Sequence, residues 1–460
     1  MRRTGRYEMD MISGPILSKV LLFSAPLMLT SVLQLLFNAA DIVVVGRYAG
    51  PTALAAVGST GALINLIVNV LMGMSIGTSV LVARYYGANK PRDVSETVHT
   101  SIAISFFGGI LFGLGGVIVC RPMLELMGTP EEVIGQAALY MRIYFAGLPV
   151  IAVYNFGSAV LRAVGDTRRP LYFLTIAGVV NVLLNLLCVI VLKMGVAGVA
   201  LPTVLSQAVA ASLVIWCLRR SDGSIHLEFR QVRVYGGKMR EIVKIGLPAG
   251  IQGSVFSISN VVIQSSVNSF GSTVMAANSA AANLEGFVYV IMNSFYQAAL
   301  TFTSQNLGAK KPERILRILF CCVGLVTAFG LVMGLSVYFA GGTLLTIYST
   351  DPEVIKWGLI RLSFVGAPYF ICGIMDTMVG MMRGLGYSIT PMIVSMVGVV
   401  GVRLGWIYTI FASQRTLQSL YVSYPVSWGI TAAVHLGCFI VAYRKIMRKR
   451  RSEAAENPTG

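Results

Sequence analysis

The chain has 460 residues, of which 55% are hydrophobic and only 12% charged, and its mean hydropathy is +0.75. An average soluble domain carries about 25% charged residues, so this composition excludes an ordinary soluble protein and indicates many membrane spans. The net charge of +17 does not indicate a nucleic-acid partner, because the basic residues gather in short segments between apolar runs.

Apolar runs bounded by glycine, proline and charged residues predict twelve transmembrane helices. In chain order they cover residues 16–46, 53–84, 94–119, 132–162, 170–192, 196–218, 241–270, 274–305, 314–339, 353–382, 389–411 and 418–443. The residues before the first run are polar and basic, and the run is too long for the core of a cleavable signal peptide. We therefore expect an all-α, multi-pass membrane protein that retains its first helix.

The orientation follows from the basic residues. Most of the 36 Lys and Arg residues fall in alternate segments between the predicted helices, including residues 219–240 and the segment 444–451 near the carboxyl end. Such an asymmetry places these segments in the cytoplasm, so we expect both termini there and the chain in a bacterial inner membrane. We interpret the basic tail as an anchor on the inner leaflet rather than an RNA-binding arm.

The two halves of the sequence repeat. Pro26 matches Pro248, and three motifs recur 221 residues later: 87–91 (GANKP), 129–134 (TPEEVI) and 161–165 (LRAVG) match 308–312 (GAKKP), 350–355 (TDPEVI) and 382–386 (MRGLG). Matches at nearly one offset indicate internal duplication. Six helices per half is an even number, so the halves share an orientation. The predicted organisation is a lobe of residues 1–218, a linker of 219–240, a lobe of 241–446 and a tail of 447–460.

These motifs give the chain a family resemblance. A proline in the first helix of each half, G-A-x-K-P after the second and R-x-x-G followed by proline after the fourth resemble the bacterial MATE (multidrug and toxic compound extrusion) transporters. The resemblance covers about residues 10–445. It implies twelve helices in two parallel lobes with pseudo-two-fold symmetry, and cation-coupled efflux of amphiphilic, often cationic, compounds. The same superfamily contains lipid-linked precursor flippases, which are the alternative function.

Asp41 lies in the first predicted span. A charge at membrane depth costs about 2.5–3.5 kcal/mol on insertion scales, so such residues are functional by default. At the repeat offset, Asp41 corresponds to Val262 or Ile263, so the second half lacks this carboxylate. Three more polar residues of the first half become apolar in the second, namely Asn181, Asn185 and Thr203, which correspond to Val402, Trp406 and Val426.

These four polar residues are predicted to converge. At 1.5 Å per residue, all four lie about 9–18 Å from the outer ends of their helices, and Asn181 and Asn185 share one helical face. Carboxylate, amide and hydroxyl oxygens suit an alkali cation, and a carboxylate can also exchange a proton. The resemblance implies a cation site at Asp41, Asn181, Asn185 and Thr203, for H⁺ or Na⁺. The alternative is a hydrogen-bonded cluster that only joins helices.

The sequence also predicts a substrate cavity. Glu285 and Asp376 are acids within spans of the second half, and they could attract a cationic substrate or form an internally bonded pair. The resemblance would allow a glutamate in the seventh helix, but that position is Phe256. The candidate lining residues are Tyr154, Asn155, Phe256, Glu285, Tyr289 and Asp376.

Other chemistries have little support. The seven cysteines show no C-x-x-C spacing, the three histidines show no ligand spacing, and no phosphate-binding loop or nucleophile motif occurs. A membrane acyltransferase would need a His paired with an acid, and His435 has no evident partner in sequence. A flippase for polyanionic headgroups should have basic residues within the spans, and we identify only Arg403 clearly inside one. We therefore expect a monomeric antiporter in the lipid bilayer, not an enzyme, with amphiphilic small-molecule substrates, no nucleic-acid partner, and no cofactor or metal beyond the coupling H⁺ or Na⁺ at Asp41.

Overall fold

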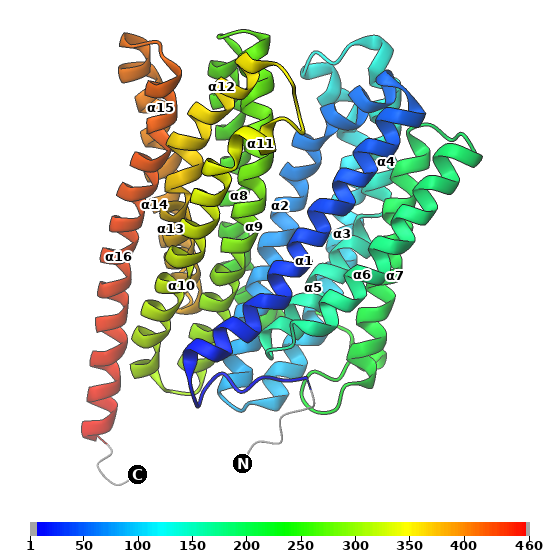
Figure 1. Cartoon of the computed structure of the whole chain (residues 1–460). Coiled ribbons are helices and arrows are strands. Elements are labelled where there is room, and N and C mark those ends of the chain that lie inside the picture. The colour runs from blue at the N-terminus through cyan, green and yellow to red at the C-terminus, as the bar shows by residue number, and fades with distance from the viewer. Residues whose placement is uncertain (1–6, 457–460) are drawn as a thin grey trace. The chain divides into compact units, whose positions relative to one another are not determined.

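A computed structural model describes residues 7–456, so the ends of the predicted amino-terminal lobe (1–6) and of the predicted tail (457–460) lie outside the described residues (Figure 1). The α-helices are α1 (Ile16–Val44), α2 (Pro51–Gly87), α3 (Pro91–Leu126), α4 (Glu131–Ala146), α5 (Leu148–Ala163), α6 (Arg168–Asn185), α7 (Ala197–Arg220), α8 (Gly236–Asn268), α9 (Ser272–Gly308), α10 (Pro312–Phe339), α11 (Gly341–Leu345), α12 (Pro352–Arg361), α13 (Phe370–Gly384), α14 (Ile389–Ser395), α15 (Val402–Trp406) and α16 (Leu417–Glu456). Short π-helical segments are η1 (Val45–Ala49), η2 (Leu186–Val191), η4 (Leu362–Gly366), η6 (Met396–Gly401) and η7 (Ile407–Phe411), and 3₁₀ segments are η3 (Phe229–Gln231) and η5 (Ala367–Tyr369).

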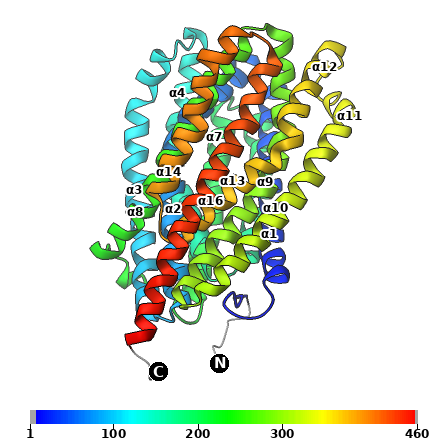
Figure 2. The same ribbon diagram turned by 90° about the vertical axis from the view of Figure 1, so that its left-hand side faces the viewer.

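The predicted all-α membrane fold is confirmed. Eleven of the described helices are long and apolar enough to cross a membrane, and the count reaches twelve when the bent pair α4–α5 is taken as one span. Figure 2 shows α16 as one long helix, whereas other predicted spans are interrupted. The fourth bends by 48° between α4 and α5, and the tenth passes through η4 and η5 between α12 and α13. Pro149 and Pro368 lie at these breaks, where their missing N–H groups remove helical hydrogen bonds.

Glycines let neighbouring helices pack directly against these breaks. A Cβ atom on Gly109 of α3 would lie 2.5 Å from the Cα of Pro149, and one on Gly113 would lie 2.5 Å from the carbonyl oxygen of Phe145. In the second half, α10 makes the equivalent approach, where a Cβ on Gly330 would lie 2.9 Å from Phe370 Cα and one on Gly334 2.7 Å from Gly366 O. The two glycine pairs are related by the 221-residue offset, so the sequence repeat extends to helix packing.

The described chain forms two compact units. Unit 1 contains residues up to Asp10 and Leu29–Ser257, and unit 2 contains Met11–Met28 and Ile258 onward. The long helices α1 and α8 therefore each contribute to both units. The predicted lobes of residues 1–218 and 241–446, divided at the central linker, stay a prediction.

In unit 2, the start of α1 is held by residues near the second G-A-x-K-P motif. The amide of Asn306 donates to the carbonyl oxygen of Met11 at 3.0 Å, and Lys311 Nζ donates to that of Ile12 at 3.0 Å. Arg314 donates to the carbonyl oxygen of Gly14 at 3.0 Å. These basic residues thus bind backbone oxygens that precede α1, besides marking the predicted cytoplasmic side.

In unit 1, the first part of α8 packs closely on α2 through glycines. A Cβ on Gly73 would lie 2.2 Å from the backbone nitrogen of Gly250, and one on Gly246 would lie 2.6 Å from Met74 Cα. The Tyr85 hydroxyl of α2 donates to the Glu241 carboxylate at 3.1 Å. Side chains this small allow backbone-to-backbone contact, which is a common way to associate helices in membranes.

The glycine contacts predict a local test of helix packing. Gly109→Ala should destabilise the protein, because the new methyl group would overlap backbone atoms of Pro149, and overpacking typically costs about 1–3 kcal/mol. Gly115→Ala, on the same helix with open space around its Cα, is the matched control and should be neutral or slightly stabilising. Thermal melting of both purified variants in detergent measures the difference, and equal melting temperatures would contradict the packing argument.

Candidate functional site

Asp41 of α1 meets α6 through a chain of amides. The side-chain nitrogen of Asn185 donates to a carboxylate oxygen of Asp41, and it also donates to the side-chain oxygen of Asn181 at 3.2 Å. Asn181 and Asn185 are buried and Asp41 is half-buried. Three of the four predicted site residues are therefore brought together in unit 1, and we call Asp41, Asn181 and Asn185 the acid–amide cluster.

A glycine on α6 makes room for this contact. Gly178 lies one turn before Asn181 on α6, and a Cβ there would lie 1.8 Å from the ring of Phe37. Phe37 and Asp41 are four residues apart on α1, so they share one face of that helix. The close approach of Phe37 to Gly178 sets the α1–α6 separation at which Asp41 reaches Asn185.

The start of α6 is fixed by Asp166. Its carboxylate accepts hydrogen bonds from the backbone N–H groups of Arg168 and Arg169, at 3.2 and 3.1 Å, and forms an ion pair with the Arg169 side chain. Burial raises the pKa of the Asp166 carboxyl, against the lowering influence of Arg169. The helix that carries Asn181 and Asn185 thus begins at a well-anchored cap.

Both helices change their winding directly beside the cluster. The π-helical segment η1 begins four residues after Asp41, and η2 begins at the residue after Asn185. The two segments contact each other. A π-helical turn leaves backbone groups less regularly paired than an α-helix does, and such turns are frequent at functional sites.

Thr203 is not joined to the cluster by a hydrogen bond. Its hydroxyl donates instead to the carbonyl oxygen of Val199 in its own helix at 2.9 Å. Tyr140 of α4 was not identified from the sequence, yet it lies within electrostatic range of Asp41 and stacks on Tyr144 with ring centroids 6.4 Å apart. The spacing of four residues between these tyrosines is the signal that could have placed both on one helix face.

The donor set fits a hard cation or a proton. The side-chain oxygen of Asn185 is buried and accepts no hydrogen bond from the described residues. This amide oxygen and the neighbouring Asp41 carboxylate are oxygen ligands of the kind that an alkali ion prefers. Among residues 7–456, no group of three or more His, Cys, Asp and Glu side chains could hold a metal ion.

The acids of unit 2 have different partners. Glu285 of α9 forms a two-pronged ion pair with Arg361 of α12, with nitrogen–oxygen distances of 2.7 and 3.0 Å. A third guanidinium nitrogen donates to the side-chain oxygen of Asn278 at 2.7 Å, and the Tyr421 hydroxyl donates to the same oxygen at 3.2 Å. All these groups are buried. The expectation that only Arg403 lies clearly inside a span is wrong, because Arg361 is accommodated there by Glu285.

Asp376 of α13 is not bonded to Glu285. It is half-buried and makes no hydrogen bond or ion pair with any residue that the structure describes. In the same unit, three aromatic rings form a row. Tyr289 packs edge-to-face on Tyr369, with 6.5 Å between ring centroids, and Tyr369 packs edge-to-face on Trp428, with 5.1 Å between centroids. An internally bonded Glu285–Asp376 pair is therefore not what the second half contains.

Arg403 of α15 lies at the far end of this aromatic row. Its guanidinium stands over the Tyr424 ring at 4.2 Å and over the Trp428 ring at 5.5 Å. Its Nε donates to the Ser427 hydroxyl at 2.9 Å. Within the described part of the chain, no carboxylate forms an ion pair with this buried guanidinium.

A family model described as MatE matches the chain twice, over residues 26–187 and 248–409. The chain belongs to the MatE family. The double match confirms the internal duplication, and the family is one of membrane transporters, as the resemblance predicts.

Individual relatives agree with this assignment. "Probable multidrug resistance protein YoeA" of Bacillus subtilis is 27% identical over 92% of this chain and 93% of its own length. A protein named "FAD transporter" from Shewanella oneidensis is 24% identical over 75% of this chain and 77% of its own length. A solved structure titled as the outward-facing conformation of a multidrug resistance MATE family transporter has a TM-score of 0.90 at 20% identity, over 97% of this chain and 100% of that one, which supports the fold.

The remaining predicted cavity residues of this MatE chain have local contacts. Tyr154 is part of the hydrophobic core of unit 1, and its hydroxyl donates to the Pro170 carbonyl oxygen at 3.4 Å. The Asn155 amide donates to the carbonyl oxygen of Ile151 in its own helix at 2.8 Å. Phe256 is half-buried on α8. Their roles in substrate binding, with those of Glu285, Tyr289 and Asp376, stay predictions.

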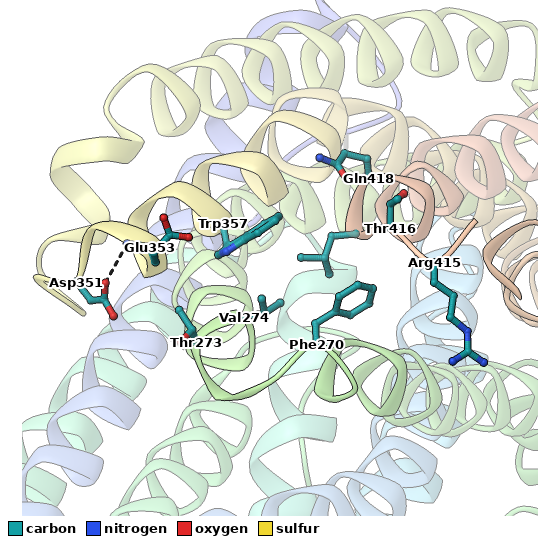
Figure 3. Close-up of a pocket in the computed structure, with 10 residues that line it drawn as sticks. Phe270, Thr273, Val274, Asp351, Glu353, Trp357, Arg415, Thr416 and Gln418 are labelled. Carbon is teal, nitrogen blue, oxygen red and sulfur yellow. Dashed lines mark hydrogen bonds between the residues drawn. The ribbon is translucent and has the colours of Figure 1, made fainter. Parts of the chain in front are cut away.

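Unit 2 also holds a pocket of about 530 Å³ (Figure 3). The Trp357 and Phe270 rings point into it, with Arg415 to one side and two acids at the start of α12 on the other. Both acids already have partners, because Asp351 accepts from the backbone N–H of Glu353 at 2.9 Å and Glu353 pairs with Lys356 at 3.2 Å. On the predicted orientation this pocket opens to the outside.

The buried ion pair predicts a stability pattern. Removing one partner, by Glu285→Met or Arg361→Met, leaves an uncompensated buried charge and should cost about 3–5 kcal/mol. The double variant should recover much of this loss, since neither charge remains. Arg415→Met, at an exposed position, is the control. Thermal melting of the four variants in detergent measures the coupling, and additive losses in the double variant would show that the pair is not the cause.

Proposed function

We propose that this MatE chain is a secondary-active multidrug efflux transporter of the bacterial cytoplasmic membrane. In this proposal it exports amphiphilic, cationic organic compounds in exchange for H⁺ or Na⁺, as a monomer with both termini in the cytoplasm and with no nucleic-acid partner. The observation that carries the proposal is the acid–amide cluster, in which a carboxylate inside a span is neutralised by no basic residue among those described. The names of the relatives support the export of drugs.

The cluster can exchange cations by two routes. A proton on the Asp41 carboxylate would remove the charge that accepts the Asn185 hydrogen bond, so protonation would loosen the α1–α6 contact. For Na⁺, the carboxylate and the Asn181 and Asn185 oxygens would be ligands, and a half-turn of the Asn185 amide would present its orphaned oxygen. Either ion changes the same contact, which allows the cation to favour one conformation of the transporter.

The membrane potential can drive this exchange. One positive charge that moves inward across the membrane gains about 2.3 kcal/mol per 100 mV, in addition to the concentration gradient of the ion. A transporter that admits one cation for each expelled compound can therefore export against a substantial gradient. A binding site inside the membrane, at a helix that changes its contacts, is the arrangement that alternating access requires.

A flippase for a lipid-linked precursor, or another exporter of organic anions, is the second candidate. Arg403 favours it, because this buried guanidinium has aromatic and hydroxyl contacts and no carboxylate partner among the described residues. The relative named as an FAD transporter is consistent with an anionic substrate. Parallel efflux assays with a cationic and an anionic fluorescent dye distinguish the two substrate classes.

The first prediction from this proposal concerns Asp41. Asp41→Asn keeps the size of the side chain but removes the titratable charge, so the variant should fold and lose gradient-driven efflux at least tenfold. Efflux of a cationic dye from proteoliposomes is measured after a Na⁺ gradient and a pH gradient are imposed separately, which also identifies the coupling ion.

Asp222→Asn, an exposed acid in the linker, is the matched control and should export as the wild type does. Melting temperature and size-exclusion profile establish that each variant is folded. Undiminished export by folded Asp41→Asn under both gradients would refute the role of this carboxylate.

The second prediction concerns the contact that positions Asp41. Gly178→Ala should push the Phe37 ring, separate Asp41 from Asn185 and lower efflux about fivefold or more. Phe37→Ala in the same chain should restore activity, because the added methyl group then has room. If the double variant stays inactive while Phe37→Ala alone is active, Gly178 acts by some other route than the α1–α6 separation.

A further inference from the structure

A second apolar cavity lies in unit 1, away from the acid–amide cluster. Helices α3 and α7 both pack against α5, and a groove of about 580 Å³ runs between them. Its floor is formed by α5, one wall by α3 and the other by α7. The residues that matter for the argument are Phe106, Phe107, Ala211, Ser212, Phe229 and Val232.

The groove is apolar and open. Phe106 and Phe107 on the α3 wall are 47% and 63% exposed, and Phe229 at one end is 56% exposed. The α7 wall is low because it consists largely of small side chains such as Ala211 and Ser212. Since both walls belong to membrane-spanning helices, this groove opens towards the hydrocarbon of the bilayer.

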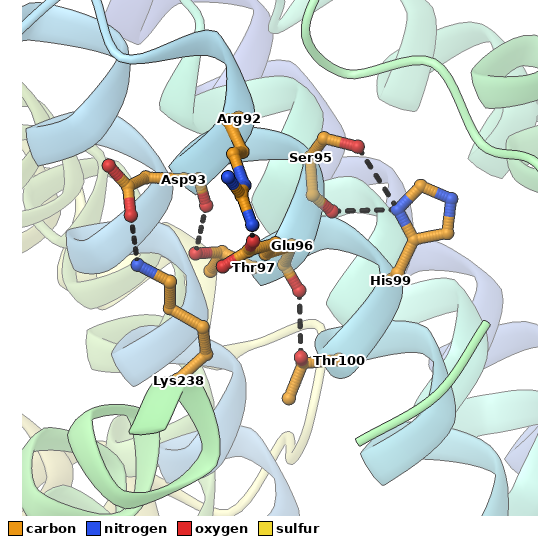
Figure 4. Close-up of polar contacts among 8 residues, drawn as sticks. All are labelled: Arg92, Asp93, Ser95, Glu96, Thr97, His99, Thr100 and Lys238. Atoms are coloured by element: carbon orange, nitrogen blue, oxygen red, sulfur yellow. Dashed lines mark hydrogen bonds and ion pairs between the residues drawn. The ribbon is translucent and has the colours of Figure 1, made fainter. Parts of the chain in front are cut away.

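The linker closes one end of the groove and is held there on both sides. The backbone N–H of Glu228 donates to the His99 ring at 3.1 Å, and that of Tyr235 donates to the Thr100 hydroxyl at 3.2 Å. Figure 4 shows His99 and Thr100 on α3, with Lys238 bound to Asp93 almost two turns earlier. The segment between these anchors carries Phe229 and Val232, so its side chains are fixed at the groove end.

Arginines surround this closed end. Arg219 stands over the Phe229 ring at 4.9 Å and Arg220 over the Trp216 ring at 4.8 Å, while Arg230 and Arg233 extend from the anchored segment. All four are exposed. Four acids lie nearby, and three of them already have partners: Glu228 is bonded to the Gln231 amide, Asp93 is paired with Lys238 and Glu96 is paired with Arg92, while Asp222 is exposed. The end of the groove therefore carries a net positive charge.

We propose that the groove binds an acyl chain of an anionic phospholipid, with the phosphate headgroup against these arginines. Along α7, the lining residues Ile215 and Ala208 lie about 8 and 18 Å from Arg220, so the groove runs from headgroup level into the hydrocarbon. An apolar groove with a basic mouth between membrane helices matches a negatively charged lipid. No lining residue carries an acid that would select a cationic drug.

The site is distinct from the proposed transport mechanism and does not depend on it. It belongs to the leaflet at the linker end of α7, which is the cytoplasmic leaflet on the predicted orientation. Because the lipid would bridge α3, α7 and the linker, its binding should stabilise unit 1.

Native mass spectrometry of the full chain in detergent tests the proposal, with phosphatidylglycerol and phosphatidylcholine added separately. The wild type should bind phosphatidylglycerol at least tenfold more tightly. Ser212→Trp, which fills the groove from an exposed position, should abolish this preference. Ser336→Trp is the matched control, because Ser336 is also exposed and its hydroxyl also bonds the carbonyl four residues earlier.

Charge removal gives an independent readout. Arg230→Gln with Arg233→Gln should weaken phosphatidylglycerol about tenfold or more and leave phosphatidylcholine unchanged, whereas Arg121→Gln with Arg415→Gln, at exposed positions outside the groove and the basic tail, should change neither. Equal affinity for the two lipids, equal effects of Ser212→Trp and Ser336→Trp, or displacement of the lipid by an exported dye at the same site would each overturn the proposal.

Discussion

The constraint on which this structure depends is that a polar group inside the bilayer must find its partner within the protein. The Glu285–Arg361 pair meets it fully, since two hydrogen bonds join the charges and Asn278 accepts a third from the guanidinium. The acid–amide cluster meets it only in part. Asn185 donates to Asp41, but its own oxygen is buried without a donor from the described residues. A cation bound beside the Asp41 carboxylate would supply the partner that the Asn185 oxygen lacks.

Glycines determine how closely several of the helices approach. Gly178 brings α1 against α6, Gly109 and Gly113 bring α3 against the α4–α5 break, and Gly73 brings α2 against α8. In each case the neighbour occupies the place of the missing Cβ. Beside the contact of Phe37 with Gly178, the Asn185 amide bonds the Asp41 carboxylate. At the α1–α6 contact, packing by glycine and pairing of polar groups therefore occur together.

The spans and the repeat could be predicted from the sequence because both depend on local features of the chain. Hydrophobic length fixes where a helix can cross the membrane, and the recurrence of G-A-x-K-P identifies the two halves without any contact information. Asp41, Asn181 and Asn185 could be grouped because depth along a helix follows from residue number. The depth estimate could not show which way a side chain points, so it did not predict that the Thr203 hydroxyl bonds within α7.

Other features depend on contacts between distant segments. The pairing of Glu285 with Arg361 joins residues 76 positions apart, and the sequence alone presented each as an isolated charge. In the sequence, the linker is recognisable only as a polar break between the two halves. In the structure, His99 and Thr100 of α3 bind its backbone. The breaks at Pro149 and Pro368 were hidden because apolar runs continue through them. Periodicity and composition carry no information on such pairings.

The two halves differ at one position of the repeat that lies near an acid in each unit. Arg361 corresponds at the repeat offset to Tyr140, and each lies near the acid of its own unit, Arg361 bound to Glu285 and Tyr140 within electrostatic range of Asp41. An arginine neutralises its carboxylate permanently, because it stays protonated at any physiological pH. A tyrosine leaves the carboxylate charged and available. The same position of the repeat therefore carries an arginine that pairs with a carboxylate in unit 2 and a tyrosine in unit 1, so among the described residues an ion pair forms at this position only in unit 2.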